Sequence, residues 1–289
     1  MRGSRKPTRK APTPLQPRRR GLKLVTDSPL ITLHQVLTDP DLPVDWDVEG
    51  LFTHGDRVMV YGEWGAFKSF LLYHLALHLA MGRDWLGHAI VMPRRVLYLD
   101  EDMGEADIRS RMKRLALGLG LTTEDLPLWV LPPQGYQVHP GFGRMLWDRC
   151  QQWSVEPTVV IIETLRQVIV GDENRAGDVV RLWRGLLYLK QRGVTVILSH
   201  HMKKPNQEFP DDLRHRASGT TAQLGQIDAS LAVTRQGKSN LVDVHPEKVR
   251  RGALGETFTA QLNETGERYQ GPMTITLDQT FRRDGGAWG

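Results

Sequence analysis

A lysine and a serine that could bind phosphate, Lys68 and Ser69, follow a loop with two glycines, Gly62 and Gly65. The loop lies between an apolar run and a long apolar helical pattern, as in the phosphate-binding sequence G-x-x-x-x-G-K-[ST]. There, backbone N–H groups hold phosphate oxygens, the lysine reaches the β- and γ-phosphates, and the hydroxyl ligates Mg²⁺. The spacing therefore predicts a site for ATP and Mg²⁺. The expected nucleotide-binding residues of this loop are Gly62, Glu63, Trp64, Gly65, Ala66, Phe67, Lys68, Ser69 and Phe70.

One position departs from this pattern, because Phe67 stands where the glycine before the lysine is expected. Either its side chain must point away from the nucleotide or the loop must open wider. The alternative interpretation is a chance pattern at a helix start. The apolar strand before the loop and the apolar helix after it argue against chance and favour nucleotide binding.

Polar residues also follow three other apolar runs directly. They are Asp100-Glu101-Asp102 after residues 96–99, Glu163-Thr164 after residues 159–162, and Ser199-His200-His201 after residues 194–198. In a doubly wound sheet, ligands bind at the carboxyl ends of the strands. Three polar strand ends beside a phosphate loop therefore predict a catalytic site rather than a binding cleft alone.

Each strand end has an expected role in phosphoryl transfer. Glu163 is expected to hold the Mg²⁺ shell, although aspartate is more usual there. Glu101 is expected to orient and deprotonate the attacking water, with Asp100 and Asp102 as alternatives. An N-terminal cap of the following helix is the interpretation without catalysis.

The histidine pair His200 and His201 is expected to provide a γ-phosphate sensor. The alternative is a core histidine bonded to the backbone. Metal binding by the pair is a weak interpretation, since no CxxC or carboxylate stands at ligand spacing.

The elements that must position these residues alternate along the chain. Apolar strands are expected at residues 58–61, 96–99, 128–131, 159–162 and 194–198, and helices after the phosphate loop and at residues 106–119, 142–153 and 179–191. Short alternating stretches at residues 230–234, 241–244, 257–262 and 273–277 predict antiparallel strands. The fold class is therefore α/β, with a doubly wound, mostly parallel sheet and antiparallel C-terminal strands.

Charge is distributed unevenly along the 289 residues. Residues 1–23 hold nine of the 38 Lys and Arg and no acid, so the other 29 stand against 33 Asp and Glu, a net charge of −4. A basic arm of this kind either binds nucleic acid or is a solvated disordered tail. The expected divisions are an arm at 1–28, a lead-in without regular elements at 29–56, an ATPase domain at 57–280 and a tail at 281–289.

The compartment is expected to be the cytoplasm, with no membrane partner. The single cysteine, Cys150, excludes an intramolecular disulfide and suits a reducing environment. The longest apolar stretch, residues 70–81, contains two histidines and is too short to span a bilayer.

Taken together, the motifs resemble a known group. The phosphate loop, residues 96–102, Val160-Ile-Ile-Glu163-Thr-Leu-Arg166 and Ser199-His-His-Met-Lys203 are similar to the RecA-like core of hexameric replicative helicases, above all the RepA-type plasmid helicases. Arg216-Ala-Ser-Gly219 followed by Asp228 resembles a segment of the DnaB branch. Glu247-Lys248-Val-Arg250-Arg-Gly252-Ala-Leu-Gly255 resembles that branch's Lys-x-Arg-x-Gly-x-x-Gly segment.

The resemblance implies a homo-oligomeric ring, usually a hexamer, with ATP between subunits. Lys248 and Arg250 would then reach the neighbour's γ-phosphate in trans; the alternative is a basic cluster on an edge strand. Arg111 would contact the base, with Arg109 as the competitor. Single-stranded DNA would bind channel loops, and the expected contacts are Lys203, Lys204, Arg214 and Arg216.

The function implied is a ring-forming replicative DNA helicase or translocase, a Mg²⁺-dependent ATP hydrolase that serves a plasmid, phage or mobile element. A primase or replication initiator is an expected partner. Two alternatives stay open: a RecA-like ATPase of recombination or defence, and an ATP-responsive binding module without unwinding activity. Phe67 and the glutamate at position 163 keep the last alternative open.

Overall fold

A computed structural model describes residues 30–202, 225–265 and 271–278 of the chain. The chain divides into two units, residues 1–43 and 44–289. The first unit contains α1 (Leu33–Thr38), whose N-terminus is capped by Thr32: its hydroxyl accepts from the backbone N–H of Gln35 at 3.2 Å.

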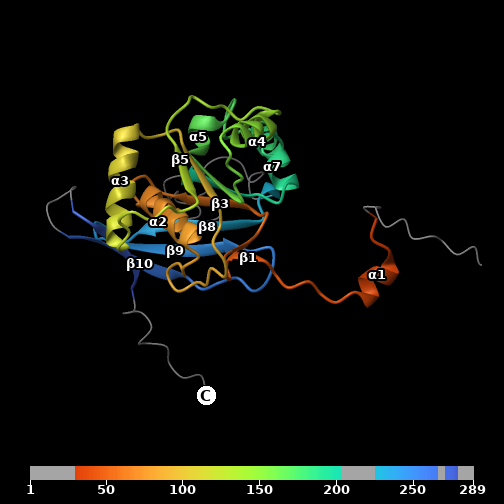
Figure 1. Cartoon of the computed structure of the whole chain (residues 1–289), viewed down its shortest axis with the longest axis horizontal. Helices are drawn as coiled ribbons and strands as arrows, with labels where there is room; N and C mark the ends of the chain where they lie inside the picture. Colours follow the sequence, from red (N-terminus) through yellow and green to blue (C-terminus); the bar gives the residue numbers. More distant parts are fainter. Residues whose placement is uncertain (1–29, 203–224, 266–270, 279–289) are drawn as a thin grey trace, which may run out of the picture. The chain divides into compact units, whose positions relative to one another are not determined.

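The elements of the second unit alternate between strand and helix over most of their order (Figure 1). They are β1 (Trp46–Val48), β2 (Phe52–Thr53), β3 (Arg57–Gly62), α2 (Lys68–Met81), β4 (Val96–Asp100), α3 (Glu105–Gly118), β5 (Leu128–Leu131), α4 (Phe142–Gln152), β6 (Val159–Glu163), α5 (Leu165–Val168), α6 (Ala176–Gly185), α7 (Leu187–Gln191), β7 (Thr195–His201), β8 (Ala229–Arg235), β9 (Leu241–Lys248), β10 (Phe258–Glu264) and β11 (Met273–Leu277).

Within the described part of the chain, nine strands form one sheet in the order β11-β10-β9-β8-β3-β7-β6-β4-β5. The strands from β8 to β5 in this order run parallel, whereas β9, β10 and β11 are antiparallel to their neighbours. The expected fold class is confirmed, and β3, which leads into the phosphate loop, lies between β7 and β8.

The sheet is covered on both faces, which is why β3, β4, β6 and β7 are apolar along almost their whole length. One core lies under α2 and α3, with Leu72, Leu75 and Leu115 nearly inaccessible. The other lies under α4, α6 and α7, with Leu146, Trp183 and Leu189. Figure 1 shows α2 and α3 together on one side of the sheet and α4 and α7 on the other.

The direction of β8 differs from the prediction of an antiparallel strand. β8 runs parallel to β3, with Val60 opposite Leu231, and is antiparallel only to β9 on its other side. An alternating pattern does not reveal strand direction, and the long connection from β7 is sufficient for the crossover that a parallel neighbour needs. The carboxyl end of β8 therefore lies at the same edge as the phosphate loop.

The lead-in also differs, because it contains α1 and the β1–β2 hairpin where no regular element was expected. Val48, Leu51 and Phe52 are fully buried in the core, so residues 44–56 belong with the sheet. Asp47, which lies in this stretch, is buried and pairs with Nε of Arg94 at 2.6 Å.

The helix expected at residues 179–191 is two helices, α6 and α7. The chain leaves regular helical geometry at Leu186, with φ −90° and ψ −6°. The preceding Gly185 packs closely against another segment, since a Cβ there would lie 2.5 Å from the carbonyl oxygen of His139. A glycine in a helix interior is unfavourable, so the helix is interrupted next to Gly185. None of the helices in the described ranges is long and apolar enough to cross a membrane.

Candidate functional site

A pocket of about 450 Å³ lies at the carboxyl edge of the parallel strands. The phosphate loop forms one side of it, and the ends of β6, β7 and β8 contribute Glu163, His201 and Arg235. Trp64 lies on its rim with 90% of its surface exposed. The fold thus brings most of the predicted nucleotide-binding residues to one place.

Two glycines shape the loop. A Cβ on Gly62 would lie 2.4 Å from the carbonyl oxygen of Val233 in β8, so only glycine fits beside that strand. Gly65 has φ +77°, a conformation that glycine adopts without strain. The loop leads into α2, whose first N–H groups lack intrahelical partners and favour an anion.

Lys68 is the charged group of the loop, and its side chain is only 6% exposed. Its Nζ donates to the carbonyl oxygens of Gly62 and Glu63, both at 2.9 Å. Burial lowers the pKa of Lys68 to about 8, while the carboxylates of Glu163 and Asp102 oppose that change. A buried ammonium group at the mouth of a helix N-terminus is well suited to hold phosphate.

Ser69 and Glu163 are in direct contact across the pocket. Ser69 Oγ donates to Oε1 of Glu163 at 2.5 Å, and the Tyr98 hydroxyl donates to Oε2. Burial raises the pKa of Glu163 to about 7, against the lowering effect of these two hydrogen bonds and of Lys68. The hydroxyl and carboxylate predicted to share Mg²⁺ are therefore adjacent.

The donor set fits Mg²⁺ and a nucleoside triphosphate. Mg²⁺ prefers oxygen ligands and usually takes one or two from protein, with phosphates and water completing the shell. Ser69 and Glu163 supply such oxygens, and the buried hydroxyl of Thr164, which lines the pocket, has no hydrogen-bond partner within the described residues. In the same ranges, no group of three His, Cys, Asp or Glu side chains could hold a metal unaided.

The three acids after β4 occupy different places. Asp100 is buried and accepts from the Tyr73 hydroxyl and from the backbone N–H groups of Asp102 and Met103. The carboxylate of Glu101 accepts from the backbone N–H groups of Gln134 and Gly135, the latter at 2.9 Å, and is not among the residues that line the pocket.

Asp102 does line the pocket. Its Oδ1 accepts from Nε2 of Gln167 at 3.1 Å. Of the three acids after β4, Asp102 is therefore the one that lines the pocket, whereas Glu101 would have to leave its backbone partners to reach it.

The two histidines also separate. His201 lines the pocket, and burial followed by the charge of Lys68 lowers its pKa below the ordinary value. His200 is fully buried in β7. Of the two, His201 is placed where a phosphate could be sensed.

Phe67, the N-cap residue directly before α2, lies in the left-handed region, with φ +58° and ψ +20°. Its ring lies against that of Phe70, with centroids 6.2 Å apart, and under the guanidinium of Arg235 at 4.4 Å. For a non-glycine residue this backbone conformation costs about 1 kcal/mol or more. The phenyl side chain turns to the wall of the pocket, as the first of the two sequence alternatives required.

Arg111 and Arg109, the two candidates for base contact, point to different places. Arg111 lies over the ring of Phe70 at 4.7 Å and lines the pocket. Arg109 is 77% exposed and pairs with Glu105 at 2.6 Å. The structure thus brings Arg111, and not Arg109, to the site.

Lys248 and Arg250 lie at the opposite edge of the sheet. Nζ of Lys248 donates to the carbonyl oxygen of Ile227 at 2.7 Å, and Nη1 of Arg250 lies 2.5 Å from Oδ1 of the buried Asp228. Asp228 precedes β8, whose first residue pairs with the amino-terminal part of β3. The length of β3, about 16 Å, separates this edge from the phosphate loop of the same chain.

Several basic groups meet on Asp228. Its Oδ2 also accepts from Nε of Arg57 at 3.1 Å and from Nζ of Lys190 at 2.6 Å. Burial raises the pKa of Asp228, but these hydrogen bonds outweigh it and bring the pKa to about 2. The carboxylate is thus a stable anchor for the basic groups at this edge.

Arg235 is a charged pocket residue that the sequence interpretation does not identify. It is the last residue of β8, two positions after Val233, where the apolar run ends. The expectation of an antiparallel strand there gave no reason to place this strand end beside the phosphate loop. The predicted DNA contacts Lys203, Lys204, Arg214 and Arg216 lie outside the described residues.

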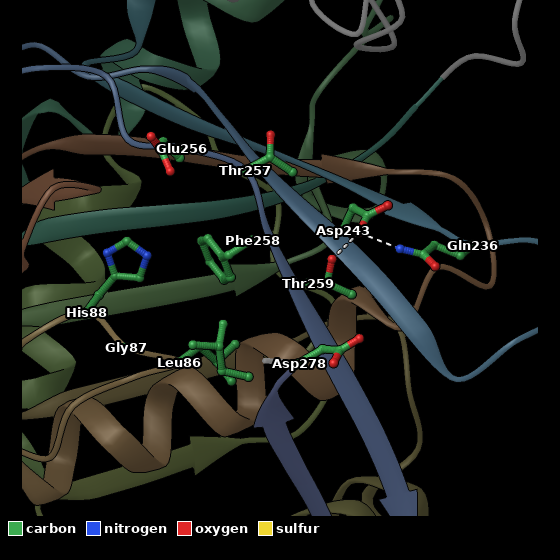
Figure 2. Close-up of a pocket in the computed structure, with 11 residues that line it drawn as sticks. Leu86, Gly87, His88, Gln236, Asp243, Glu256, Thr257, Phe258, Thr259 and Asp278 are labelled. Carbon is green, nitrogen blue, oxygen red and sulfur yellow. Dashed lines mark hydrogen bonds between the residues drawn. The ribbon is translucent and has the colours of Figure 1, made fainter. Parts of the chain in front are cut away.

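A larger cavity, about 610 Å³, lies between the β9–β10 part of the sheet and residues 86–88 (Figure 2). Asp243 there accepts from Nε2 of Gln236 at 2.8 Å and from Oγ1 of Thr259 at 2.6 Å. None of the predicted site residues lines this cavity. We therefore take the smaller pocket at the phosphate loop as the candidate site.

The sequence matches the AAA domain family over residues 26–207. No curated protein matches it. Solved structures with a similar fold include the RadB recombinase, at 16% identity over 78% of this chain and 91% of that chain, with a TM-score of 0.51. A KaiC-like protein of the hyperthermophilic archaeon Pyrococcus horikoshii is 15% identical over 83% and 100% of the chains, with a TM-score of 0.52. A DnaB-like replicative helicase, described with its interactions with primase, is 16% identical over 86% of this chain and 68% of that chain, with a TM-score of 0.57.

Proposed function

Because this chain belongs to the AAA domain family and has a RecA-like P-loop ATPase fold, we propose that it hydrolyses ATP to move along or unwind single-stranded DNA. The cofactors are ATP and Mg²⁺. The compartment we propose is the cytoplasm, where the single thiol of Cys150 stays reduced.

The contact between Ser69 and Glu163, beside the buried Lys68, is the observation that carries the proposal. Mg²⁺ held there would neutralise charge on the phosphates. Lys68 binds the β- and γ-phosphates, and His201 senses the γ-phosphate. Glu101 activates water after leaving Gln134 and Gly135, or Asp102 does so from its present place.

The position of Lys248 and Arg250 supports assembly into a ring. They lie at the edge opposite their own phosphate loop, so any nucleotide they reach belongs to a neighbouring copy. An arginine at the γ-phosphate stabilises the transition-state charge, which makes hydrolysis depend on the neighbour. We propose a hexamer on the resemblance to replicative helicases.

Single-stranded DNA is the proposed substrate of movement, and a primase or initiator the proposed partner, for a plasmid, phage or mobile element. Support comes from the basic residues 203–216, from the basic arm and from the likeness to a DnaB-like helicase. We propose the domain divisions expected from sequence, with residues 44–56 added to the ATPase domain because they pack with the sheet.

The test is steady-state ATP hydrolysis with and without single-stranded DNA, with Lys68→Ala as the blank. Stimulation by DNA supports a motor and leads to unwinding assays. Hydrolysis that ignores DNA keeps the ATPase and rejects the DNA motor. No hydrolysis above the blank, with ATP still bound, would replace the proposal by an ATP-responsive binding module.

A second candidate function is a filament-forming ATPase of recombination or defence. The likeness to the RadB recombinase favours it, since that chain is covered over 91% of its length. Electron micrographs of the protein with ATP and DNA separate the two: closed rings support the helicase, and open filaments support the second candidate.

A further inference from the structure

Two stacked tyrosines, Tyr73 of α2 and Tyr98 of β4, lie behind the candidate site. Both side chains are fully buried, and their ring centroids are 4.5 Å apart with an angle of 24° between the planes. Ser69 precedes Tyr73 by four positions and therefore lies on the same face of α2. Asp100 follows Tyr98 by two positions and therefore lies on the same face of β4. The stack thus connects the helix face that carries Ser69 to the strand face that carries Asp100.

Each tyrosine hydroxyl is bonded to a different buried carboxylate. Tyr98 donates to Oε2 of Glu163, and Tyr73 donates to Oδ2 of Asp100. The two carboxylates lie opposite each other, at the paired ends of β6 and β4. Because a buried carboxylate without donors is unfavourable, these hydrogen bonds fix the orientation of both groups.

The bond from Tyr98 leaves Glu163 one oxygen that faces the phosphate loop. Oε1 accepts from the Ser69 hydroxyl at 2.5 Å, while Oε2 is held by Tyr98. A carboxylate whose second oxygen is held cannot turn freely, so Glu163 would present Oε1 to Mg²⁺ beside the Ser69 hydroxyl. Tyr98 itself is not among the residues that line the pocket.

The bond from Tyr73 acts on the segment that follows β4. Oδ1 of Asp100 accepts from the backbone N–H groups of Asp102 and of the next residue, both at 2.9 Å. The backbone N–H of Glu101 donates to the carbonyl oxygen of Glu163 at 2.6 Å. The segment that carries both candidates for water activation is therefore held by the carboxylate that Tyr73 orients and by the end of β6.

We propose that Tyr73 and Tyr98 are a pair of positioning residues that place the metal-binding carboxylate and the water-activating segment relative to each other. Tyr98 orients Glu163, Tyr73 orients Asp100 and through it the segment of Asp102, and the ring stack keeps the two tyrosines together. Neither tyrosine contacts nucleotide or metal. This inference rests on the proposed function, since it assigns the support of the same Mg²⁺ and water sites.

Tyr98→Phe tests the metal side, because it removes one hydroxyl and keeps the ring. Isothermal titration calorimetry gives the ATP dissociation constant in Mg²⁺ and in EDTA, and their ratio is the factor by which Mg²⁺ strengthens binding. This factor should fall roughly tenfold in Tyr98→Phe, as is usual when the partner of a metal ligand is lost. Binding in EDTA should stay unchanged, since Lys68 and the loop are intact. An unchanged Mg²⁺ factor would overturn the role of Tyr98.

Tyr73→Phe tests the other side. It should keep the Mg²⁺ factor and lower kcat at saturating ATP and Mg²⁺ roughly tenfold, because the segment of Asp102 loses part of its support. A normal kcat would overturn the role of the Tyr73 hydroxyl. Tyr73→Leu also removes the ring behind Tyr98, so it should reduce the Mg²⁺ factor as well. A folded Tyr73→Leu variant with the wild-type factor would overturn the link between the two tyrosines.

Tyr188→Phe is the matched control. It deletes the same kind of group from α7, where the hydroxyl accepts from Arg192 at 2.8 Å, and it should bind and hydrolyse ATP as the wild type does. Circular dichroism melts accompany every variant. A lower melting temperature of Tyr73→Phe and Tyr98→Phe with wild-type kcat and Mg²⁺ factor would overturn the proposal in favour of packing alone. A wild type without Mg²⁺-dependent hydrolysis would instead reject the proposed function itself.

Discussion

The hydroxyl of Ser69 donates a hydrogen bond of 2.5 Å to Oε1 of Glu163, across 94 residues of sequence. It joins the start of α2 to the carboxyl end of β6. The Tyr98 hydroxyl holds the other carboxylate oxygen from β4. Three elements thus fix the pair before any nucleotide binds, and such preorganisation is what a transferring phosphoryl group requires.

Glu163→Gln should retain ATP binding and lose hydrolysis by about a hundredfold or more, since the amide keeps the shape and removes the charge that holds the metal. The measurement is kcat over a Mg²⁺ titration, together with the ATP dissociation constant. Asp148→Asn, an exposed acid on α4, is the control and should behave as the wild type. Unchanged kcat in Glu163→Gln would contradict the assignment of Glu163 to the metal.

Glu101→Gln and Asp102→Asn separate the two candidates for water activation. If Glu101 moves into the pocket on binding, Glu101→Gln should lower kcat by about a hundredfold or more, and Asp102→Asn should change it little. The reverse result assigns the role to Asp102. Single-turnover rates, measured with enzyme in excess over ATP, give the answer, and equal normal rates in both variants would exclude Glu101 and Asp102 as the base.

Arg250→Ala should lower turnover roughly a thousandfold in assembled oligomers, because the neighbour's nucleotide loses its guanidinium. Mixing it with Lys68→Ala subunits should restore part of the activity, since each variant supplies what the other lacks. Arg251→Ala, the adjacent exposed arginine, is the control. Normal hydrolysis by Arg250→Ala in confirmed oligomers would rule out action in trans.

His74 should make the protein less stable in mild acid. Its Nδ1 accepts from the Trp85 indole at 3.1 Å, and its Nε2 lies 3.1 Å from Nε2 of His78. Since His78 Nδ1 must donate to the Asp84 carbonyl oxygen at 2.7 Å, His74 must donate through Nε2, and both rings are neutral. Burial, reinforced by His78, lowers the pKa of His74 to about 3.

The direction of this pH effect follows from the difference between the pKa of His74 in the unfolded chain and its pKa in the folded chain. The unfolded chain takes up a proton at His74 near pH 6.5, whereas the folded chain does so only near pH 3, so the free energy of unfolding falls between these values. The loss from this group approaches about 1.4 kcal/mol per pH unit. Urea unfolding at pH 7.5, 6 and 5 should show a weaker pH dependence for His74→Gln than for the wild type. The exposed His34→Gln is the control, and parallel curves for wild type and His74→Gln would contradict the prediction.

The phosphate loop and Glu163 could be predicted because each is a local pattern: a strand, then a residue of the required chemistry at its end. Arg235 also lies at a strand end, but the sequence did not identify it. The direction of β8 depends on a distant partner, β3, and the alternation of apolar and polar residues does not reveal that direction. Asp47 shows the same limit. Its burial depends on Arg94 and Thr195, so the local sequence alone suggested a loop.

Placement of side chains within the site was the least predictable part. Asp100, Glu101 and Asp102 are consecutive, yet they face the core, the loop after β5 and the pocket respectively. The backbone conformation at each of these residues decides where its side chain points, and the residue types alone do not reveal it. Phe67 is similar: the sequence shows a large side chain where a glycine is expected, and only the structure shows that it packs against Phe70 and the guanidinium of Arg235.

β3, the strand that leads into the phosphate loop, is synthesised well before its two neighbours in the sheet, β7 and β8. β3 lies between β7 and β8, and the backbone N–H of Arg57 bonds to Asp228, 171 residues away. Such distant pairing makes folding slow, because a long loop must close before the contact forms. A chain still on the ribosome therefore exposes the whole loop motif for most of its synthesis without the strands that give the motif its shape. A fragment that ends before residue 229 would contain every residue of the loop but would lack β8, against which Gly62 packs, and Arg235, which lines the pocket.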